Sequence, residues 1–270
     1  MKGLKLVWVT LKGFVIIILL SFLSLNSFAQ SDIKKFKAAE DSINYYLNKM
    51  SVHSTYFSGE YDTIWNKKLF NYLLNLCNTQ PATLKEKFEN LIAPEKLDIV
   101  TSDDKKFRIY SWDNMNGGTA HSFSSIIQYQ AGNKVRAITL YDDATENLLI
   151  DTPEYFYSNL YTIKTNANKT VYLAVRKAMF SSKDVSMGIQ AFTIDGNTVQ
   201  DTIKFFQTKK ECLNNFDCIY TFGYETKPVI HFSKDRKLLY VANIGYESAP
   251  TNWLIYKFDG YKFVYDHNEK

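Results

Sequence analysis

The chain has 270 residues, of which 32 are Lys or Arg and 28 are Asp or Glu. Three of the lysines and none of the acids fall in residues 1–29, which leaves 29 basic residues against 28 acidic ones in the remainder. This balance gives no basis for a nucleic-acid partner, and the 46% content of hydrophobic residues predicts a folded core and excludes extensive disorder.

The N-terminus has the pattern of a secretory signal peptide. Three lysines precede an apolar run from Phe14 to Leu25, and Ser27-Phe28-Ala29 supplies small residues for a cleavage site. A membrane anchor is the alternative, but the run is shorter than the roughly 20 apolar residues that a bilayer requires. We therefore expect a signal peptide at residues 1–29 and an exported mature chain, periplasmic or extracellular, without a membrane span.

Residues 30–96 have helical periodicity. Apolar residues recur at helical spacing between Ile33 and Met50, and again between Thr63 and Cys77. A third helix is expected after Pro81, because Thr83 and Glu86 have the spacing of a capping box. Three short helices do not make a convincing independent bundle, so this helical segment is expected to pack on the part of the chain that follows.

From Leu97 onward, apolar and polar residues alternate as they do in half-buried strands. Turn glycines at Gly132, Gly196 and Gly260 are spaced by 64 residues, and their Asp and Asn neighbours favour the positive φ of tight hairpins. The pattern predicts an α+β fold, mostly antiparallel β, in which residues 97–270 form a β-meander domain. Its three four-stranded units are expected at about 97–142, 158–207 and 228–266.

Twelve strands are expected in these units, at Leu97–Val100, Phe107–Trp112, Phe123–Tyr129, Val135–Leu140, Leu160–Lys164, Val171–Phe180, Gly188–Ile194, Val199–Phe206, Val229–Phe232, Leu238–Ile244, Trp253–Phe258 and Tyr261–Tyr265. Such units resemble propeller blades, but closed propellers have roughly four to eight of them. An open array, with helices covering an exposed edge or face, is therefore expected. A non-repetitive α+β fold with chance matches between turns is the alternative.

The loop of the first unit holds the most concentrated group of polar residues. The candidate contact residues are Trp112, Asp113, Asn116, Gly117, Gly118 and His121. A carboxylate beside an imidazole can orient a general base, and a hairpin could bring Asp113 and His121 together. Asp, Asn and Gly are also the residues that loop geometry alone selects. We therefore treat the loop as a binding surface and assign no catalytic residue.

Other chemistry receives little support from the sequence. The chain contains no HExxH, GxSxG, Walker A or GxGxxG motif, and its histidines lack metal-ligand spacing. No metal site and no cofactor are expected. Aromatic residues such as Tyr155, Phe156 and Tyr157 lie outside the clear core stripes and could stack on sugars or line a protein interface, although Tyr and Phe also simply suit strands.

Three cysteines in an exported chain allow one disulfide and one free thiol. Cys212 and Cys218 bracket a loop-like segment and are the expected pair. Cys77 lies within an apolar helical pattern, so it is expected to be a buried small hydrophobe.

The stretch Ser111-Trp112-Asp113, continued by Gly117-Gly118-Thr119-Ala120-His121, resembles a hairpin of exported proteins of the Bacteroidetes type. This resemblance implies export and a shared β fold, and it implies no activity and no catalytic residue.

Taken together, these patterns predict an exported β-repeat protein that acts as a non-catalytic binding or interaction module for a protein or a glycan. Two alternatives remain open. One is a hydrolase-like enzyme that uses Asp113 and His121, and the other is an accessory subunit of a cell-envelope complex.

Overall fold

The computed structural model describes residues 36–51, 60–91, 96–115, 119–141, 155–181, 183–221, 229–243 and 252–269. The expected signal peptide at residues 1–29 lies outside the described residues, so export stays a prediction. The chain divides into two compact units, and the first includes the described residues 36–45 and 88–91. In this unit, the Glu40 carboxylate accepts hydrogen bonds from the backbone N–H and the side-chain amide of Asn90, at 2.8 and 2.7 Å.

Two α-helices lie in the described part of the chain, at residues 36–51 and in α2 (Glu60–Thr79). In α2, the buried residues Leu69, Leu73 and Cys77 recur every four residues and form one apolar stripe. The helical periodicity expected over this segment is confirmed. Asn78 of α2 also bonds the backbone of Ala137 through both its amide oxygen and its amide nitrogen, at 2.9 and 3.2 Å, so the helix covers part of a sheet edge.

The prediction of a third helix is wrong. The segment forms only a short 3₁₀ helix, η1 (Pro81–Leu84), followed by irregular backbone. Arg108 supplies the reason, because its Nη1 donates to the carbonyl oxygens of Thr83 and Glu86, both at 2.6 Å. An α-helix would use those carbonyls internally. Phe88, with φ of +54°, also lies outside the right-handed helical region.

The described strands all belong to the second unit and form three sheets. The first has four antiparallel strands in chain order, β1 (Leu97–Thr101), β2 (Phe107–Asp113), β3 (Phe123–Ala131) and β4 (Lys134–Tyr141). The second has the order β11-β7-β6-β5 and contains β5 (Phe156–Lys164), β6 (Thr170–Met179), β7 (Asp184–Asp195) and β11 (Asn215–Thr221), with β8 (Thr198–Gln200) also paired to β7.

The third sheet has the order β10-β9-β15-β14-β13-β12. Its strands are β9 (Phe206–Gln207), β10 (Cys212–Leu213), β12 (Ile230–Phe232), β13 (Leu238–Asn243), β14 (Asn252–Phe258) and β15 (Phe263–Glu269). All pairings in it are antiparallel except that of β15 with β9, which is parallel.

The mostly antiparallel β fold with an N-terminal helical segment is confirmed, but three equal four-stranded units are not. The expected strand Val199–Phe206 divides into β8, which stays on β7, and β9, which joins the third sheet. The length of β7, 12 residues, explains this difference. β8 pairs with its last three residues and β11 with its first seven, so two segments share one edge.

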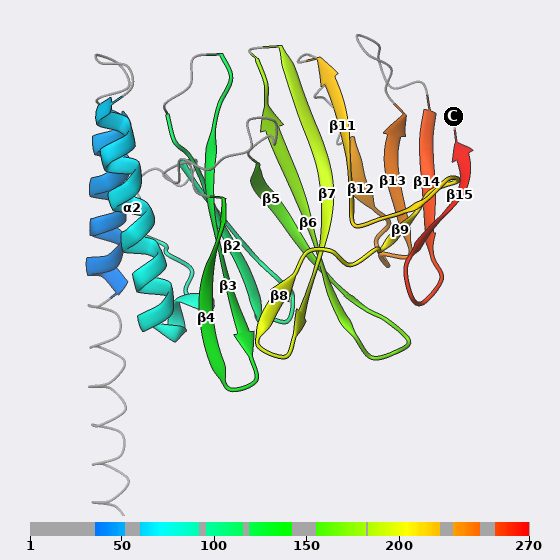
Figure 1. Ribbon diagram of the computed structural model, residues 1–270, viewed down its shortest axis with the longest axis horizontal. Coiled ribbons are helices and arrows are strands. Elements are labelled where there is room, and N and C mark those ends of the chain that lie inside the picture. The colour runs from blue at the N-terminus through cyan, green and yellow to red at the C-terminus, as the bar shows by residue number, and fades with distance from the viewer. Residues whose placement is uncertain are drawn as a thin grey trace, which may run out of the picture. The chain divides into compact units, whose positions relative to one another are not determined.

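The sheets pack face to face in chain order, as the ribbon of the second unit shows (Figure 1). Strand β6 lies at the centre of this packing. Tyr172 and Ala174 join the cluster that includes Phe107 of the first sheet, whereas Val171 and Leu173 join the cluster that includes Phe263 of the third. Because β6 is buried on both faces, its sequence is a nearly continuous apolar run.

One turn recurs in all three sheets, between β1 and β2, between β5 and β6, and between β12 and β13. Its fourth residue has positive φ in each case: Lys105 at +57°, Asn168 at +58° and Arg236 at +58°. That residue's N–H donates to the carbonyl of the first turn residue, at 2.8–2.9 Å. The three hairpin glycines, Gly132, Gly196 and Gly260, also have the expected positive φ, at +57°, +54° and +97°. The turns therefore repeat more regularly than the strands.

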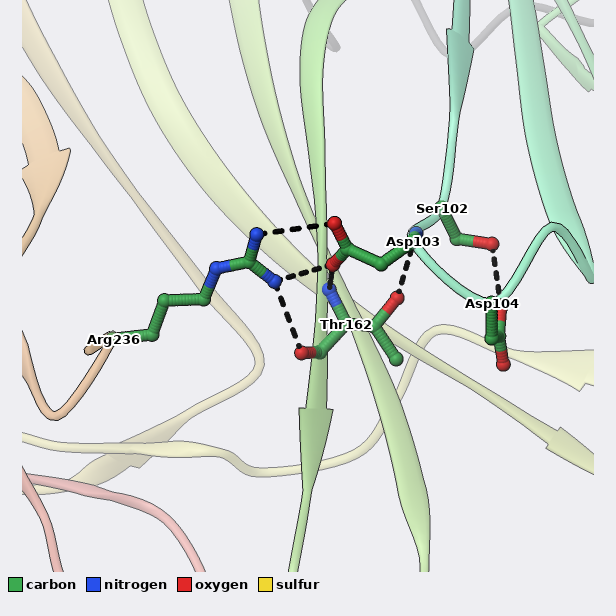
Figure 2. Close-up of polar contacts among 5 residues, drawn as sticks. All are labelled: Ser102, Asp103, Asp104, Thr162 and Arg236. Carbon is green, nitrogen blue, oxygen red and sulfur yellow. Dashed lines mark hydrogen bonds and ion pairs between the residues drawn. The ribbon is translucent and has the colours of Figure 1, made fainter. Parts of the chain in front are cut away.

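An ion pair joins the recurring turns of the first and third sheets. The Arg236 guanidinium forks onto the Asp103 carboxylate, with Nη2 3.1 Å from Oδ1 and Nη1 bonded to Oδ2 (Figure 2). Asp103 also exchanges hydrogen bonds with Thr162 of β5, through its backbone N–H at 3.1 Å and its Oδ2 at 3.0 Å. The hydrogen bonds from Arg236, followed by that from Thr162, lower the pKa of Asp103 although burial opposes the shift.

Candidate functional site

The hairpin between β2 and β3 brings together Asp113 and His121. Nδ1 of His121 lies 2.5 Å from Oδ2 of Asp113, and Oδ1 of Asp113 accepts the N–H of Met115 at 2.7 Å. The backbone of His121 is also fixed, because its N–H donates to the carbonyl of Met179 on β6 at 3.0 Å. The first and second sheets therefore hold this pair between them. Asn116, Gly117 and Gly118 lie outside the described residues.

The two ring nitrogens of His121 have different surroundings. Nδ1 faces the Asp113 carboxylate, and no described residue hydrogen-bonds to Nε2. The side chains of His121 and Asp113 are 36% and 25% exposed, so the pair is accessible to a small ligand. A carboxylate at Nδ1 fixes the tautomer and orientation of an imidazole, which leaves Nε2 as the atom able to contact a bound group.

A pocket of about 210 Å³ opens beside this pair. It is lined by Lys96, Asp98, Trp112, Asp113, His121, Phe123, Phe156 and Met179. The rings of Phe123 and Phe156 lie 4.9 Å apart between centroids, and the imidazole of His121 stacks at 6.3 Å from Phe123. Residues from five strands (β1, β2, β3, β5 and β6) and from their connections thus give the pocket an aromatic wall next to charged groups.

Asp98 of β1 adds a second carboxyl group to the pocket. Burial raises its pKa above the ordinary value, and the positive charge of Lys177 partly offsets that rise. No described residue donates a hydrogen bond to this carboxylate. Lys96, by contrast, is engaged, because its ammonium donates to the Ser51 hydroxyl.

Trp112 has a different position from the one expected. Its side chain is 1% exposed, its Nε1 donates to Oδ1 of Asn66 at 2.7 Å, and its ring packs against Phe70 at 5.9 Å. Both partners belong to α2. Trp112 therefore anchors the helix on the first sheet, and it contributes to the pocket as a buried part of its wall.

Sequence reasoning missed four residues that line the pocket, namely Lys96, Asp98, Phe123 and Met179, and it named Phe156 only as one of several aromatic residues that could contact a ligand. Asp98 interrupts an apolar strand with a charge, and Phe156 belongs to the aromatic run singled out above, so each had a local signal. Tyr155 and Tyr157, which flank Phe156 in the sequence, are buried, at 6% and 0% exposure. No local pattern reveals that these strands meet the β2–β3 hairpin, because that contact depends on how the sheets pack.

The expected disulfide between Cys212 and Cys218 is not formed, and all three cysteines are free. The two residues belong to different sheets, since Cys212 on β10 pairs with Gln207 and Cys218 on β11 pairs with Met187. Burial, followed by the charge of Asp217, raises the pKa of Cys218 to about 12. Cys77 is fully buried, as expected, and burial raises its pKa to about 11.

A second pocket, of about 250 Å³, lies where β11 meets β13 and β14. Its walls include Phe216, Cys218, Val241, Leu254 and Tyr256. The Cys218 thiol lies 3.6 Å from the carbonyl oxygen of Ala242. With its raised pKa, this thiol stays protonated near neutral pH and is a poor nucleophile.

Among the described residues, no group of three or more His, Cys, Asp or Glu side chains could hold a metal ion. The helices within the described ranges include none that is long and apolar enough to cross a membrane. A scan against protein-family models gave no match, and searches of curated proteins and of solved structures gave none either.

Proposed function

We propose that this protein is an exported, non-catalytic binding module that holds a small polar group of a protein or glycan in the pocket beside Asp113 and His121. The observation that carries the proposal is the convergence of these two side chains, with a 2.5 Å contact, on a pocket of about 210 Å³ that has an aromatic wall. Pockets for drug-sized ligands are larger, at roughly 300–1,000 Å³. The pocket therefore suits one side chain or one sugar-sized group.

Arrays of glycans and peptides probed with the purified protein test this proposal. We expect a defined class of probes to bind, and we expect His121→Gln to weaken that binding roughly tenfold or more, since it removes a hydrogen-bonding group from the site. His267→Gln is a matched control, because His267 forms a similar contact with Asp266 at 2.7 Å but is 56% exposed and lies outside the pocket. Binding that survives His121→Gln and Asp113→Asn unchanged would overturn the proposal.

Hydrolysis is the second candidate function, and the orientation of His121 favours it. An imidazole with a carboxylate at Nδ1 and a free Nε2 can take a proton from water. The described walls of the pocket contain no Ser, Thr or Cys, so the nucleophile would be a water molecule or an Asp carboxylate. A panel of ester and glycoside substrates decides between the two functions, because only an enzyme would show turnover that His121→Gln abolishes and His267→Gln preserves.

A further inference from the structure

The carboxylate of Asp98 is the group in the pocket that the protein itself leaves without a hydrogen-bond donor among the described residues. It shares the pocket with the carboxylate of Asp113, so two negative charges face the space. The described walls of the pocket hold one ammonium group, that of Lys96, which donates to the Ser51 hydroxyl, and the imidazole of His121 contacts the Asp113 carboxylate. This arrangement repels an anion and attracts a cation.

The aromatic wall has the same preference. Rings of Phe carry negative charge on their faces and attract cations within about 6 Å of the centroid. Phe156 already shows this behaviour, because Nζ of Lys177 lies 5.9 Å from its centroid. The second ring, Phe123, lies 4.9 Å from Phe156. The pocket thus combines a free carboxylate with aromatic faces, which is the combination that recognises alkylammonium and guanidinium groups.

We propose that the group bound in this pocket is an organic cation of the size of one lysine or arginine side chain, held by the Asp98 carboxylate and the rings of Phe123 and Phe156. The inference rests on the binding function proposed above and names its ligand class. Burial raises the pKa of Asp98, so the folded protein already favours additional positive charge at this carboxyl. Lys177 satisfies that preference only in part, since its ammonium makes no ion pair with Asp98 within 4 Å in the described structure.

Titration with four small probes tests the ligand class. The probes are the Nα-acetyl amides of lysine and arginine, the neutral Nα-acetyl amide of norleucine, and n-butylamine. Backbone NMR shifts and calorimetry on the whole protein measure their binding. We expect both cationic amides to bind and to shift the backbone resonances of Asp98, His121 and Phe156. We expect the norleucine amide to bind at least tenfold more weakly. n-Butylamine carries the ammonium group without the peptide groups of the lysine amide. Equal affinity of these two probes would show that the peptide groups contribute nothing to binding.

Three variants make the test specific. Asp98→Asn removes the charge that the cation needs, so affinity should fall roughly ten- to a hundredfold. Asp195→Asn, at the exposed last residue of β7, changes the net charge equally and should leave affinity within twofold. Lys177→Gln should have the opposite effect and tighten binding severalfold, because it removes the internal cation that competes for Phe156.

The possible results separate the two proposals. Equal binding of norleucine and lysine amides, or unchanged affinity in Asp98→Asn, would overturn the cation assignment while leaving the pocket as a binding site. Array probes that bind in a His121-dependent manner, together with no response to any cationic probe, would also overturn the assignment alone. Arrays with no His121-dependent probe would remove the binding function itself.

Discussion

Arg176–Asp217 and Arg236–Asp103 are two arginine–aspartate pairs in different surroundings. In the first, Nε and Nη2 of Arg176 contact the two carboxylate oxygens at 3.0 and 2.5 Å, and the side chains are only 7% and 23% exposed. In the second, Nη1 and Nη2 of Arg236 contact the two carboxylate oxygens of Asp103 between two turns, and the side chains are 35% and 49% exposed. The first pair lies within one sheet, whereas the second joins two sheets.

The buried pair depends on a residue that has no side chain. Arg176 is the cross-strand neighbour of Gly188, and Gly188 is in turn the neighbour of Asp217. A Cβ atom at Gly188 would lie 1.7 Å from Oδ1 of Asp217, so only glycine lets the guanidinium reach across β7. Burial lowers the pKa of Arg176, but the hydrogen bonds and charge of Asp217 outweigh this effect and raise it above the ordinary value.

The difference teaches where an ion pair is indispensable. Arg176 donates Nη1 to Gln190 at 3.0 Å and lies 4.0 Å from the ring of Tyr155, so it cannot turn to water if its partner is lost. Arg236 can, because its pair is exposed and screened by solvent. We therefore expect the two pairs to differ several-fold in their effect on the free energy of unfolding.

The largest expected effect is that of Asp217→Ala. Removing one partner of a buried pair leaves an uncompensated charge, which costs about 3–5 kcal/mol of unfolding free energy. Urea unfolding followed by circular dichroism measures the loss. Arg176→Met combined with Asp217→Leu is the control, since it removes both charges and should cost much less. A loss below about 1 kcal/mol for Asp217→Ala would show that Arg176 finds another partner.

The next effect is that of Gly188→Ala, which tests the register that allows the buried pair. The added methyl group must displace the Asp217 carboxylate, and such overpacking costs about 1–3 kcal/mol. Gly188→Ala in the Asp217→Ala background should cost far less, because the two changes act on one contact. Additive losses in the double variant would contradict this explanation.

The smallest effect is that of Arg236→Gln, which removes the exposed pair. Exposed pairs contribute about 0.2–1 kcal/mol, and the difference from the unmodified protein should vanish in 1 M salt, where the screening length is about 3 Å. Asp217→Ala should keep most of its effect in the same buffer. Equal salt sensitivity of both variants would remove the distinction between the two pairs.

The same variant changes how stability depends on pH. The folded pKa of Asp103 lies below its ordinary value, so its contribution is present above the unfolded pKa and is lost as pH falls through the folded pKa. In Arg236→Gln, the NMR-titrated pKa of Asp103 should move up toward the ordinary value. The contribution of Asp98 to stability depends on pH in the opposite direction. Its pKa is raised in the folded state, so its contribution is present at low pH and is lost as pH rises through the folded pKa.

Local chemistry explains which parts of the fold could be predicted. The hairpin glycines and most strands follow from turn preference and alternation, both of which act within a few residues. The prediction of a third helix was wrong because Arg108, which is distant in sequence, donates hydrogen bonds to the carbonyl oxygens of Thr83 and Glu86. The segment between Cys212 and Cys218 has a loop-like sequence, but its second half belongs to strand β11, where Asp217 pairs with Arg176 of β6.

The candidate site follows the same rule. The proximity of Asp113 and His121 could be anticipated because one hairpin carries both residues. Asp98 and Phe156 come from strands whose position depends on sheet packing. The inward position of Trp112 depends on Asn66 of α2, which no pattern in the loop indicates.

The parallel pairing of β15 with β9 affects the order of folding. Phe263 pairs with Phe206, more than fifty residues earlier in the sequence, and β15 lies between β14 and β9 in the finished sheet. During synthesis, β9 and β10 therefore emerge before β15, the strand with which β9 pairs. Long-range and parallel pairings form slowly, and the waiting segment exposes Phe205 and Phe206, both buried in the native state. Closure of the third sheet should thus be the slow step of folding, and the stage most prone to aggregation.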